Sequence, residues 1–371
     1  MTISDHLNES IRQLDASFIN TTYDSPPSYD PLNHYKDLAK DNYYRKLLIY
    51  RHIVKQLCDE FMSAKLNAIN VDLFMLTPSV SSPMGPGSDS EALPIMFGEL
   101  ESYLTDSSQF GFEPLLMNGL DRCYCYLPSM RGEDPDARHL NQFYHCEIEI
   151  CGGLSEVMDI AESFVKYLCN NMKLPLNILR GMCSDYESSK LLLERAGSDE
   201  CFQRIEFDKA VDVLVENGHK QLVNFTDHGR DISSQGELKL LEILKINTPL
   251  WIVRFDRDRV PFYQKPDPSD NNKVLNADLI FPPVSSSGFG GEILGAGQRQ
   301  DNSEQMYSSL ERQGLSSQPY EWYIELRNDP RYSTTSGFGL GIERLISWAI
   351  GLDNIRDAII YPRLKNILTT P

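Results

Sequence analysis

The stretch that decides the fold lies near the C-terminus: Gly337-Phe338-Gly339-Leu340-Gly341-Ile342-Glu343-Arg344-Leu345, followed by an apolar segment. Its glycines carry no Cβ, so two segments can approach closely there and leave room for a ligand. The apolar spacing that continues through Trp348 and Ile350 predicts a helix with one buried face, with Arg344 in its first turn. A guanidinium fixed at that position suits a phosphate. The stretch therefore predicts a phosphate-binding arginine held by glycine-rich backbone.

Several further motifs occur upstream, and each of them alone would be ordinary. A glycine-rich run is usually a structural turn, and the dinucleotide-binding fingerprint is excluded because no strand, turn and helix with a later acidic residue frame this one. Isolated arginines and carboxylates are usually surface ion pairs. The ordered set is more informative: Tyr43 to Pro78, Leu104-Thr105-Asp106-Ser107-Ser108-Gln109, Met130-Arg131-Gly132-Glu133-Asp134, Arg138-His139-Leu140-Asn141-Gln142-Phe143, Glu147-Ile148-Glu149, Gly291-Glu292-Ile293-Leu294-Gly295-Ala296-Gly297-Gln298-Arg299 and Glu321-Trp322-Tyr323-Ile324-Glu325-Leu326-Arg327.

Together these motifs resemble the class II aminoacyl-tRNA synthetases of the asparaginyl and aspartyl branch. Residues 130–143 are similar to motif two of that class, the C-terminal stretch to motif three, and residues 43–78 to motif one. The loop at 104–109, with Glu113 behind it, resembles the amino-acid-binding loop of the asparaginyl enzymes, and residues 321–327 resemble the strand before motif three. The resemblance covers roughly residues 41 to 363. It implies an α+β class II synthetase fold, with an antiparallel six-stranded sheet flanked by helices.

Composition limits the partners of the chain. It has 371 residues and a formal net charge of −18, which counts against a broadly basic surface for a tRNA backbone without excluding a local patch. No apolar run approaches membrane-spanning length, and the N-terminus has no targeting pattern. The eight cysteines show no zinc-site spacing and are expected to be reduced core thiols. A cytoplasmic protein without membrane contact is predicted.

Residues 1–40 form a polar leader that is interrupted by Ser25-Pro26-Pro27-Ser28. Such a segment is expected to be a helix and loop packed on the core. It is too short for the five-stranded anticodon-binding barrel of the aspartyl and asparaginyl enzymes. We therefore predict an N-terminal extension at 1–40 and a class II synthetase-like catalytic domain at 41–371, without the anticodon-binding domain. A homodimer is expected, because the resemblance identifies 43–78 with the dimer-forming motif one.

Hydrophobic periodicity predicts the elements between the motifs. Helical spacing covers 44–66, 155–171 and 205–217. Alternating, β-rich stretches cover 69–77, 122–130, 142–151, 249–255 and 320–328. Strands grouped in the middle and at the end, with helices between them, favour an α+β arrangement. Two turn-forming segments, 85–89 and 267–272, are predicted loops, and the resemblance marks the first as the mobile loop near the substrate pocket.

The resemblance implies ATP-dependent adenylation of an amino acid, with Mg²⁺ as the metal. An acid oxygen attacks the α-phosphate while pyrophosphate leaves, so catalysis depends on positioning and on stabilising negative charge. Arg131 would hold the substrate carboxylate and the α-phosphate, and Arg344 the β- and γ-phosphates, which makes both the expected catalytic residues. Asp278 and Glu292 match the metal-binding acids of the family, and carboxylate oxygens with phosphate suit magnesium. The implied ATP-binding set is Arg131, Glu133, Arg138, His139, Phe143, Glu292 and Arg344.

Within that set Phe143 would stack on adenine and Glu133 would reach its exocyclic amine. A strand at 142–149 places Phe143, His145, Glu147 and Glu149 on one face, because side chains alternate along a strand. Carboxylates then point into the pocket for the substrate side chain, and Arg299 matches the family's arginine for a side-chain oxygen. An arginine with an opposing carboxylate suits an amide, so asparagine is favoured over aspartate. The expected amino-acid-binding residues are Ser107, Ser108, Gln109, Glu147, Glu149, Arg299 and Gly339, of which the serines and Gln109 suit the α-ammonium.

The chain departs from the family pattern at three places. Residues 285–290 are an insertion after Asp278, Gly295-Ala296-Gly297 replaces Gly-Gly-Ser, and Thr335 stands where the family has a histidine. With the charge and the leader, these changes favour acyl transfer to an acceptor other than ordinarily selected tRNA: a small amine, a carrier protein or a tRNA supplied differently. Three alternatives stay open: an asparagine synthetase that amidates aspartate with ammonia, an ordinary asparaginyl-tRNA synthetase, and an inactive paralogue acting as a binding or regulatory module.

Overall fold

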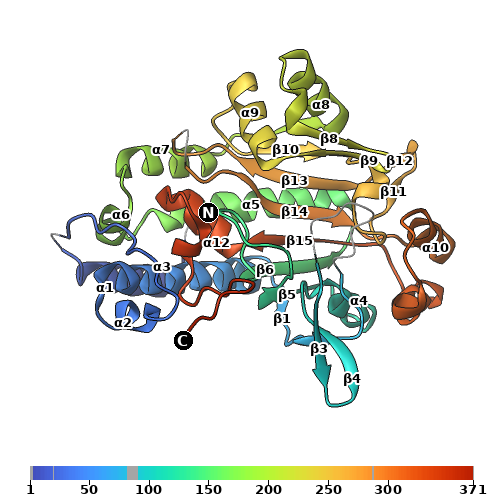
Figure 1. The fold of residues 1–371 in the computed structure, drawn as a ribbon, viewed down its shortest axis with the longest axis horizontal. Coiled ribbons are helices and arrows are strands. Elements are labelled where there is room, and N and C mark those ends of the chain that lie inside the picture. The colour runs from blue at the N-terminus through green and yellow to red at the C-terminus, as the bar shows by residue number, and fades with distance from the viewer. Residues whose placement is uncertain (1–2, 20, 82–90, 286–287, 371) are drawn as a thin grey trace.

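The computed structural model describes residues 3–19, 21–81, 91–285 and 288–370. The predicted loop at 85–89 lies outside the described residues, as do Ser286 and Ser287 of the insertion. A large sheet runs through the middle of the molecule, and helices cover it (Figure 1). Among the described helices, none is long and apolar enough to cross a membrane.

The central sheet has eight strands in the order β1-β5-β6-β15-β14-β13-β10-β7. The six inner strands, from β5 to β10, pair antiparallel throughout, and the edge strands β1 and β7 pair parallel with their neighbours. The α+β class and the antiparallel six-stranded sheet are therefore confirmed, with one short strand added at each edge. In sheet order the strands span Ile69–Asn70, Arg122–Met130, Gln142–Cys151, Thr335–Gly341, Gly291–Gln298, Asn276–Phe281, Leu250–Val253 and Gln203–Glu206.

Glycines line the middle of this sheet, where β14 pairs with β15. Gly295 lies opposite Gly339, and Gly297 lies opposite Gly337. A Cβ on Gly337 would collide with the carboxylate of Glu149 on β6, so only glycine lets that side chain pass over β15. The sequence predicts neither strand, because glycine is depleted in strands and hides their alternation.

Helices α3 (Asn42–Asp59), α5 (Leu154–Met172) and α12 (Ile342–Ile350) contribute to the main core on one face of the sheet. Helix α3 continues as a π-helical turn to Lys65, which confirms the helix predicted at 44–66. The helices predicted at 155–171 and 205–217 are α5 and α8 (Phe207–Glu216), and Arg344 lies in the first turn of α12 as predicted. The other α-helices are α1 (Asp5–Ala16), α2 (His34–Lys40), α4 (Gln109–Met117), α6 (Leu176–Met182), α7 (Tyr186–Ala196), α9 (Ser234–Leu244), α10 (Ser303–Arg312) and α11 (Glu321–Glu325).

The strand predicted at 320–328 is wrong, because this segment is helical. A 3₁₀ turn ending at Tyr320 leads into α11, and a second 3₁₀ turn ends at Asn328. The buried positions Tyr320, Tyr323, Ile324 and Arg327 recur at three- and four-residue spacing, which is the helical period. The prediction at 69–77 is correct only at its ends, which form β1 and β2 (Leu76–Thr77).

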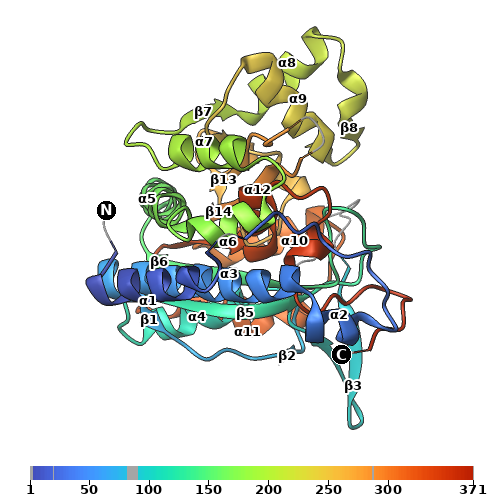
Figure 2. The same ribbon diagram turned by 90° about the vertical axis from the view of Figure 1, so that its left-hand side faces the viewer.

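Smaller units surround the sheet. Strands β3 (Leu93–Phe97) and β4 (Leu100–Leu104) form a hairpin that projects from the body, and α8 and α9 cap the opposite end around a separate core (Figures 1 and 2). Two further hairpins pair β8 (Val223–Thr226) with β9 (Gly229–Ile232) and β11 (Pro266–Asp267) with β12 (Asp270–Val274). Near the N-terminus, α1 packs against α3 and α6 and buries Leu7 and Ile11.

Candidate active site

Two adjoining cavities lie on the face of the sheet opposite the main helical core. Their volumes are about 190 Å³ and about 90 Å³, and they share Arg131, His145, Glu292 and Gly339. The predicted alternation along β6 is confirmed, because the side chains of 143, 145, 147 and 149 line the cavities while Cys146 and Ile150 enter the core. With the single exception of Ser108, every predicted site residue lines one of the two cavities.

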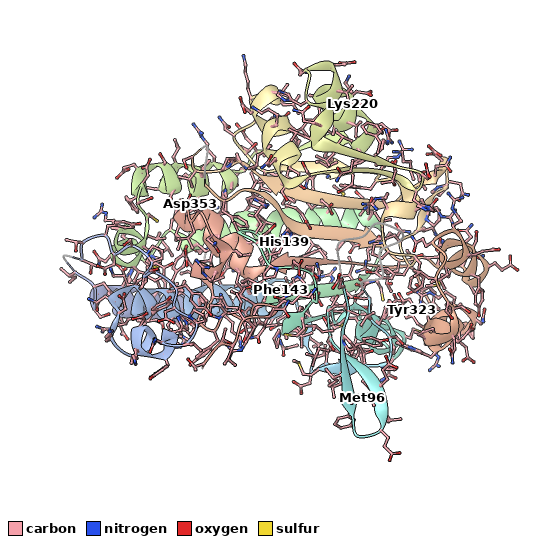
Figure 3. The ribbon with its side chains drawn as sticks, viewed as in Figure 1. Met96, His139, Phe143, Lys220, Tyr323 and Asp353 are labelled. Carbon is pink, nitrogen blue, oxygen red and sulfur yellow. The ribbon has the colours of Figure 1, made fainter. Side chains whose placement is uncertain are left out.

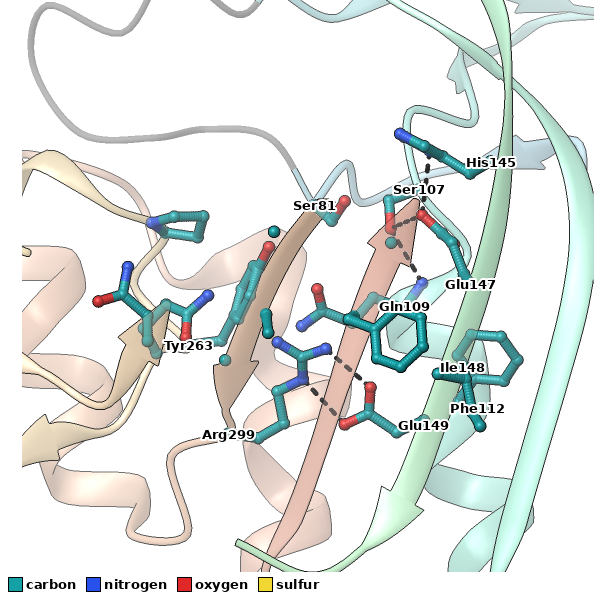
Figure 4. Close-up of a pocket in the computed structure, with 18 of the residues that line it drawn as sticks. Ser81, Ser107, Gln109, Phe112, His145, Glu147, Ile148, Glu149, Tyr263 and Arg299 are labelled. Carbon is teal, nitrogen blue, oxygen red and sulfur yellow. Dashed lines mark hydrogen bonds and ion pairs between the residues drawn. The ribbon is translucent and has the colours of Figure 1, made fainter. Parts of the chain in front are cut away.

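The larger cavity contains a fully formed ion pair between Arg299, just after β14, and Glu149 on β6. Nε of Arg299 donates to Oε1 of Glu149 at 2.8 Å, and Nη2 donates to Oε2 at 2.7 Å (Figure 4). Both side chains are buried. Burial raises the pKa of Glu149 to about 7 against the opposing charge of Arg299. A cationic donor and a carboxylate therefore meet at one wall, and both are desolvated.

Glu147 is the second buried carboxylate of this cavity, and its neighbours stabilise its charge. It accepts a hydrogen bond from the Ser107 hydroxyl at 2.9 Å (Figure 4) and another from the Ser108 backbone amide at 2.8 Å. Nδ1 of His145 lies 3.2 Å from the same carboxylate. Burial alone would raise the pKa of Glu147, but the contacts from His145 and Ser108 lower it to about 2. Glu147 is therefore a fixed negative charge at neutral pH.

The structure contradicts the expectation that Ser108 faces the substrate. Its hydroxyl is fully buried and contacts the Glu147 carboxylate and the thiol of Cys125. Only Ser107 and Gln109 of this loop line the cavity. Because the chain turns into α4 at this point, successive side chains point in different directions. Ser108 therefore supports Glu147 from behind.

The smaller cavity has an aromatic wall and a cationic wall. Phe143 lies edge-to-face with His145, with ring centroids 4.8 Å apart, and the Arg131 guanidinium lies 5.3 Å from the Phe143 ring (Figure 3 labels Phe143 and His139). Nδ1 of His139 lies 2.9 Å from Asp136. Arg138 lies over the ring of Phe289, in the described part of the insertion, at 4.6 Å. A flat ring and the guanidinium groups of Arg131, Arg138 and Arg344 suit a purine nucleotide with its phosphates.

Carboxylates crowd the junction of the two cavities. Arg344 donates to Oε2 of Glu292 at 2.8 Å, and the Glu292 backbone amide donates to Glu237 of α9 at 2.9 Å. Burial, together with the charges of Glu292 and Glu237, raises the pKa of Asp278 well above its ordinary value. Burial and the charge of Glu292 raise the pKa of Glu237 to about 7. A cation bound at this junction would therefore lower the pKa of both carboxyl groups.

The donor set fits a magnesium ion that is shared with a nucleotide. A Cβ placed on Gly295 would lie 3.3 Å from Asp278 and 3.4 Å from Glu292, so the two predicted metal ligands point into the same space. Within the described ranges, no group of three or more histidine, cysteine or acidic side chains is arranged to hold an ion alone. Magnesium commonly takes one or two carboxylates and completes its shell with phosphate and water. Asp278 and Glu292 match that pattern.

Comparison with known proteins identifies the family. Residues 29–365 match the family described as tRNA synthetases class II (D, K and N). This chain belongs to the class II tRNA synthetases. The synthetase family assigned from the motifs is therefore confirmed.

Three proteins that resemble the chain are asparaginyl enzymes. The chain is 32% identical over 271 residues to the asparagine–tRNA ligase of Thermococcus gammatolerans, covering 72% of this chain and 58% of that protein. It is 33% identical to cytoplasmic asparagine–tRNA ligase 1 of Arabidopsis thaliana, covering 71% and 45%. The asparaginyl-tRNA synthetase of Pyrococcus horikoshii, solved with asparaginyl-adenylate, superposes with a TM-score of 0.78 at 26% identity, over 91% of this chain and 72% of that one. The chain spans little more than half the length of the first of these curated relatives.

Three residues of this synthetase site escape prediction from the sequence. Tyr263 is buried at the larger cavity, with its ring 5.8 Å from the Arg299 guanidinium. Asp106 lines the same cavity and accepts two hydrogen bonds from Ser81 at 3.1 Å. Glu237 joins the acidic junction from α9. No motif spacing signals Tyr263 or Glu237, whereas Asp106 lies inside the quoted loop at 104–109.

The three sequence departures lie around the site in different ways. Ala296 lines the larger cavity directly. Thr335 is buried, and its carbonyl accepts a hydrogen bond from the amide of Arg299, which lines the larger cavity, at 2.9 Å. The described part of the insertion reaches the smaller cavity through Phe289, whose ring contacts Arg138. The departures are therefore divided between the two cavities.

Proposed function

We propose that this chain activates asparagine with ATP to form asparaginyl-adenylate and pyrophosphate. The observation that carries the proposal is the continuity of two unlike cavities. One is walled by the buried Arg299–Glu149 pair, and the other by Phe143 with Arg344. Arg131, which both cavities share, lies where an amino-acid carboxylate would meet an α-phosphate. The asparagine–tRNA ligases that resemble this chain support the same reaction.

In this mechanism the protein supplies position and charge. Arg131 orients the asparagine carboxylate for attack on the α-phosphate, and Arg344 holds the departing pyrophosphate. Phe143 stacks on adenine, Glu133 accepts from its exocyclic amine, and Arg138 and His139 bind the phosphates. The oriented guanidinium groups stabilise the negative charge that develops on the phosphoryl oxygens.

The electrostatics of the larger cavity favour asparagine over aspartate. The asparagine amide accepts from Arg299 through its oxygen and donates to Glu149 through its nitrogen. An aspartate carboxylate would lie against ionised Glu149, and that like-charge contact in a desolvated site is unfavourable. Glu147, Ser107 and Gln109 would bind the α-ammonium. Amide selection by a donor and an acceptor together is the basis of the proposed substrate.

We propose that Asp278 and Glu292 hold Mg²⁺ together with the nucleotide phosphates. When it is bound, the metal neutralises phosphate charge during the transfer. Its binding would also keep Asp278 ionised, because an adjacent cation offsets the repulsion from Glu292 and Glu237. Glu237 would act from the second layer, where it accepts from the Glu292 amide.

The acyl acceptor stays a prediction. We propose an acceptor other than ordinarily selected tRNA, and support for it comes from the net charge of −18 and from Thr335 beside Arg299. The asparagine–tRNA ligases that resemble the chain favour tRNA as the second candidate. Incubation with ATP, labelled asparagine and total tRNA separates the two. Charging as rapid as that of a full-length synthetase would establish tRNA as the acceptor.

We further propose a cytoplasmic homodimer. The exposed side chains of Leu48 on α3 (57% exposed) and Ile69 on β1 (49% exposed) lie in the segment that resembles motif one, where a twofold mate would cover them. Seven of the eight cysteines are buried or partly buried free thiols, which suits a reducing compartment. Light scattering at micromolar concentration should give the mass of two chains.

The decisive test of the activity is amino-acid-dependent exchange of labelled pyrophosphate into ATP, without tRNA, for each of the twenty amino acids. We expect exchange with asparagine, weaker exchange with aspartate and none with the others. Exchange with no amino acid would refute the proposed activity and favour an inactive binding module. Exchange with aspartate alone, with ammonia-dependent release of asparagine, would favour an asparagine synthetase.

A further inference from the structure

A second buried ion pair lies directly behind the wall of the larger cavity, which is the proposed amino-acid cavity; the smaller one is the proposed nucleotide cavity. Nη2 of Arg327, just after α11, lies 2.7 Å from Oε2 of Glu113 on α4, and both side chains are fully buried. The hydroxyl of Tyr323 donates to Glu113 and accepts from Nη2 of Arg327 at 2.9 Å (Figure 3 labels Tyr323). Neither Glu113 nor Arg327 lines either of the two cavities.

Burial of this ion pair has a large desolvation cost in free energy. Two charges lose their hydration when they are buried, and apolar residues of similar size often stabilise a protein equally well or better. The local core would accept such residues, because Phe110, Phe262, Tyr320 and Ile324 already pack there. The pair therefore calls for a reason other than stability.

The contacts of the pair connect the two walls of the amino-acid cavity. Glu113 belongs to α4, the helix that begins at Gln109 on one wall. Nε of Arg327 donates at 2.8 Å to the carbonyl of Gln300, the residue that follows Arg299 on the other wall. The 2.7 Å pair is thus a short cross-link between the loop that faces the α-ammonium and the strand end that carries the side-chain arginine.

The pair also acts on the charge of the wall itself. After burial and the opposing effect of Arg299, the carboxylate of Glu113 is a further cause of the raised pKa of Glu149. Arg327, over the rings of Tyr323 and Tyr332 at 4.1 and 4.7 Å, balances Glu113. Removing one member alone would change the charge that Glu149 experiences, and removing both would release the cross-link while keeping the local charge balanced.

We propose that Glu113 and Arg327 form a positioning pair that sets the selectivity of the cavity for a side-chain amide over a carboxylate. The inference rests on the proposed function. Asparagine needs a donor and an acceptor at fixed separation, whereas aspartate needs donors only. Loss of the cross-link therefore lowers kcat/KM for asparagine more than for aspartate. A displacement on the order of 1 Å in such a site lowers the rate by up to about 10²-fold.

The test uses the double variant Glu113→Leu with Arg327→Met, which replaces the buried pair by apolar side chains. We expect a folded protein whose ratio of asparagine to aspartate kcat/KM in pyrophosphate exchange falls about tenfold or more. The change should lie mainly in the KM for asparagine, with the KM for ATP within about twofold of the parent, because the pair contacts no residue of the nucleotide cavity. The pair Lys46→Met with Asp24→Asn, which removes a buried lysine contact between α3 and the segment around 24, is the matched control and should leave the ratio unchanged.

Three outcomes decide the matter. A folded double variant with the parent's asparagine-to-aspartate ratio overturns the inference and leaves the pair a structural one. If the double variant does not fold, Glu113→Gln with Arg327→Lys takes its place and is judged on the same ratio. If the parent exchanges with no amino acid, the proposed function fails separately, and calorimetric binding of asparagine and aspartate to parent and variant without ATP still decides the positioning role.

Discussion

The two ends of the site handle buried charge in opposite ways. At the amino-acid end, which is the larger cavity, two buried carboxylates have partners within the protein: Arg299 for Glu149, and serine and histidine donors for Glu147. At the nucleotide end, Asp278, Glu292 and Glu237 repel one another, and the pKa values of Asp278 and Glu237 are raised. The first end is therefore preformed, and we propose that a bound cation completes the second. In the proposed mechanism selectivity therefore belongs to the preformed end, and the Mg²⁺ that binds with ATP supplies positive charge at the other.

The largest expected effect tests the nucleotide end. Arg344→Ala removes the cation proposed to face the departing phosphates, and we expect pyrophosphate exchange to fall by about 10²–10³-fold, because oriented charge stabilisation is lost from the transition state. The fold should survive, since the Arg344 side chain pairs with Glu292 at the cavity and does not fill the hydrophobic core. Arg312→Ala, which breaks a pair with Asp258 away from the site, is the control. Exchange at the parent rate in Arg344→Ala would exclude the phosphate-binding role.

The matching change at the amino-acid end is Arg299→Leu. It should weaken asparagine binding by about 1.5–3 kcal/mol, because one charged hydrogen bond to the substrate is lost, while ATP binding stays near the parent value. Calorimetry with each ligand separately measures both effects, and a melting curve confirms that the protein is folded despite the unpaired Glu149. Loss of ATP affinity with unchanged asparagine affinity would assign Arg299 to the nucleotide end and invert the comparison.

A smaller effect follows from the pH dependence of Glu149. Its pKa of about 7 reflects burial, then the opposing Arg299, then the like charge of Glu113; Cys123 and Thr335 face it from β5 and β15. Above pH 7 ionised Glu149 accepts from an amide and repels a carboxylate, and below pH 7 the protonated group tolerates aspartate. The asparagine-to-aspartate ratio should therefore rise about tenfold between pH 6 and pH 8. A ratio that falls or stays flat over this range, with Glu149→Gln as the pH-independent control, would exclude Glu149 as the discriminator.

The sequence predicts those parts of the site that depend on local order, and misses those that depend on long-range folding. Alternation along one strand correctly groups Phe143 with Glu149, because the period of two is set by backbone geometry. The predicted helix after Gly341 correctly places Arg344 in its first turn, because the helical period of 3.6 is also set by backbone geometry. Glu237 and Tyr263 reach the site from segments whose own spacing carries no signal, so only the folded chain reveals them. The strand predicted at 320–328 is wrong because short apolar runs fit either period.

Ser107 and Ser108 provide the smallest and sharpest test of the preformed end. Both donate to Glu147, but Ser107 lines the cavity and Ser108 is buried behind it. Ser108→Ala removes a hydroxyl while the backbone amide of residue 108 still donates to the carboxylate, so we expect a loss of about 0.5–1.5 kcal/mol in the free energy of unfolding. The KM of this variant for asparagine should change by less than about threefold, since the contact from the backbone amide to Glu147 persists.

Ser107→Ala should do the reverse, raising the KM with little effect on stability, because the Ser107 hydroxyl faces the substrate side of Glu147. Parallel urea unfolding and pyrophosphate exchange measure both quantities. If Ser108→Ala raises the KM more than Ser107→Ala does, asparagine binding depends mainly on how Ser108 orients Glu147. The Ser107 hydroxyl on the cavity wall would then have no direct role in binding.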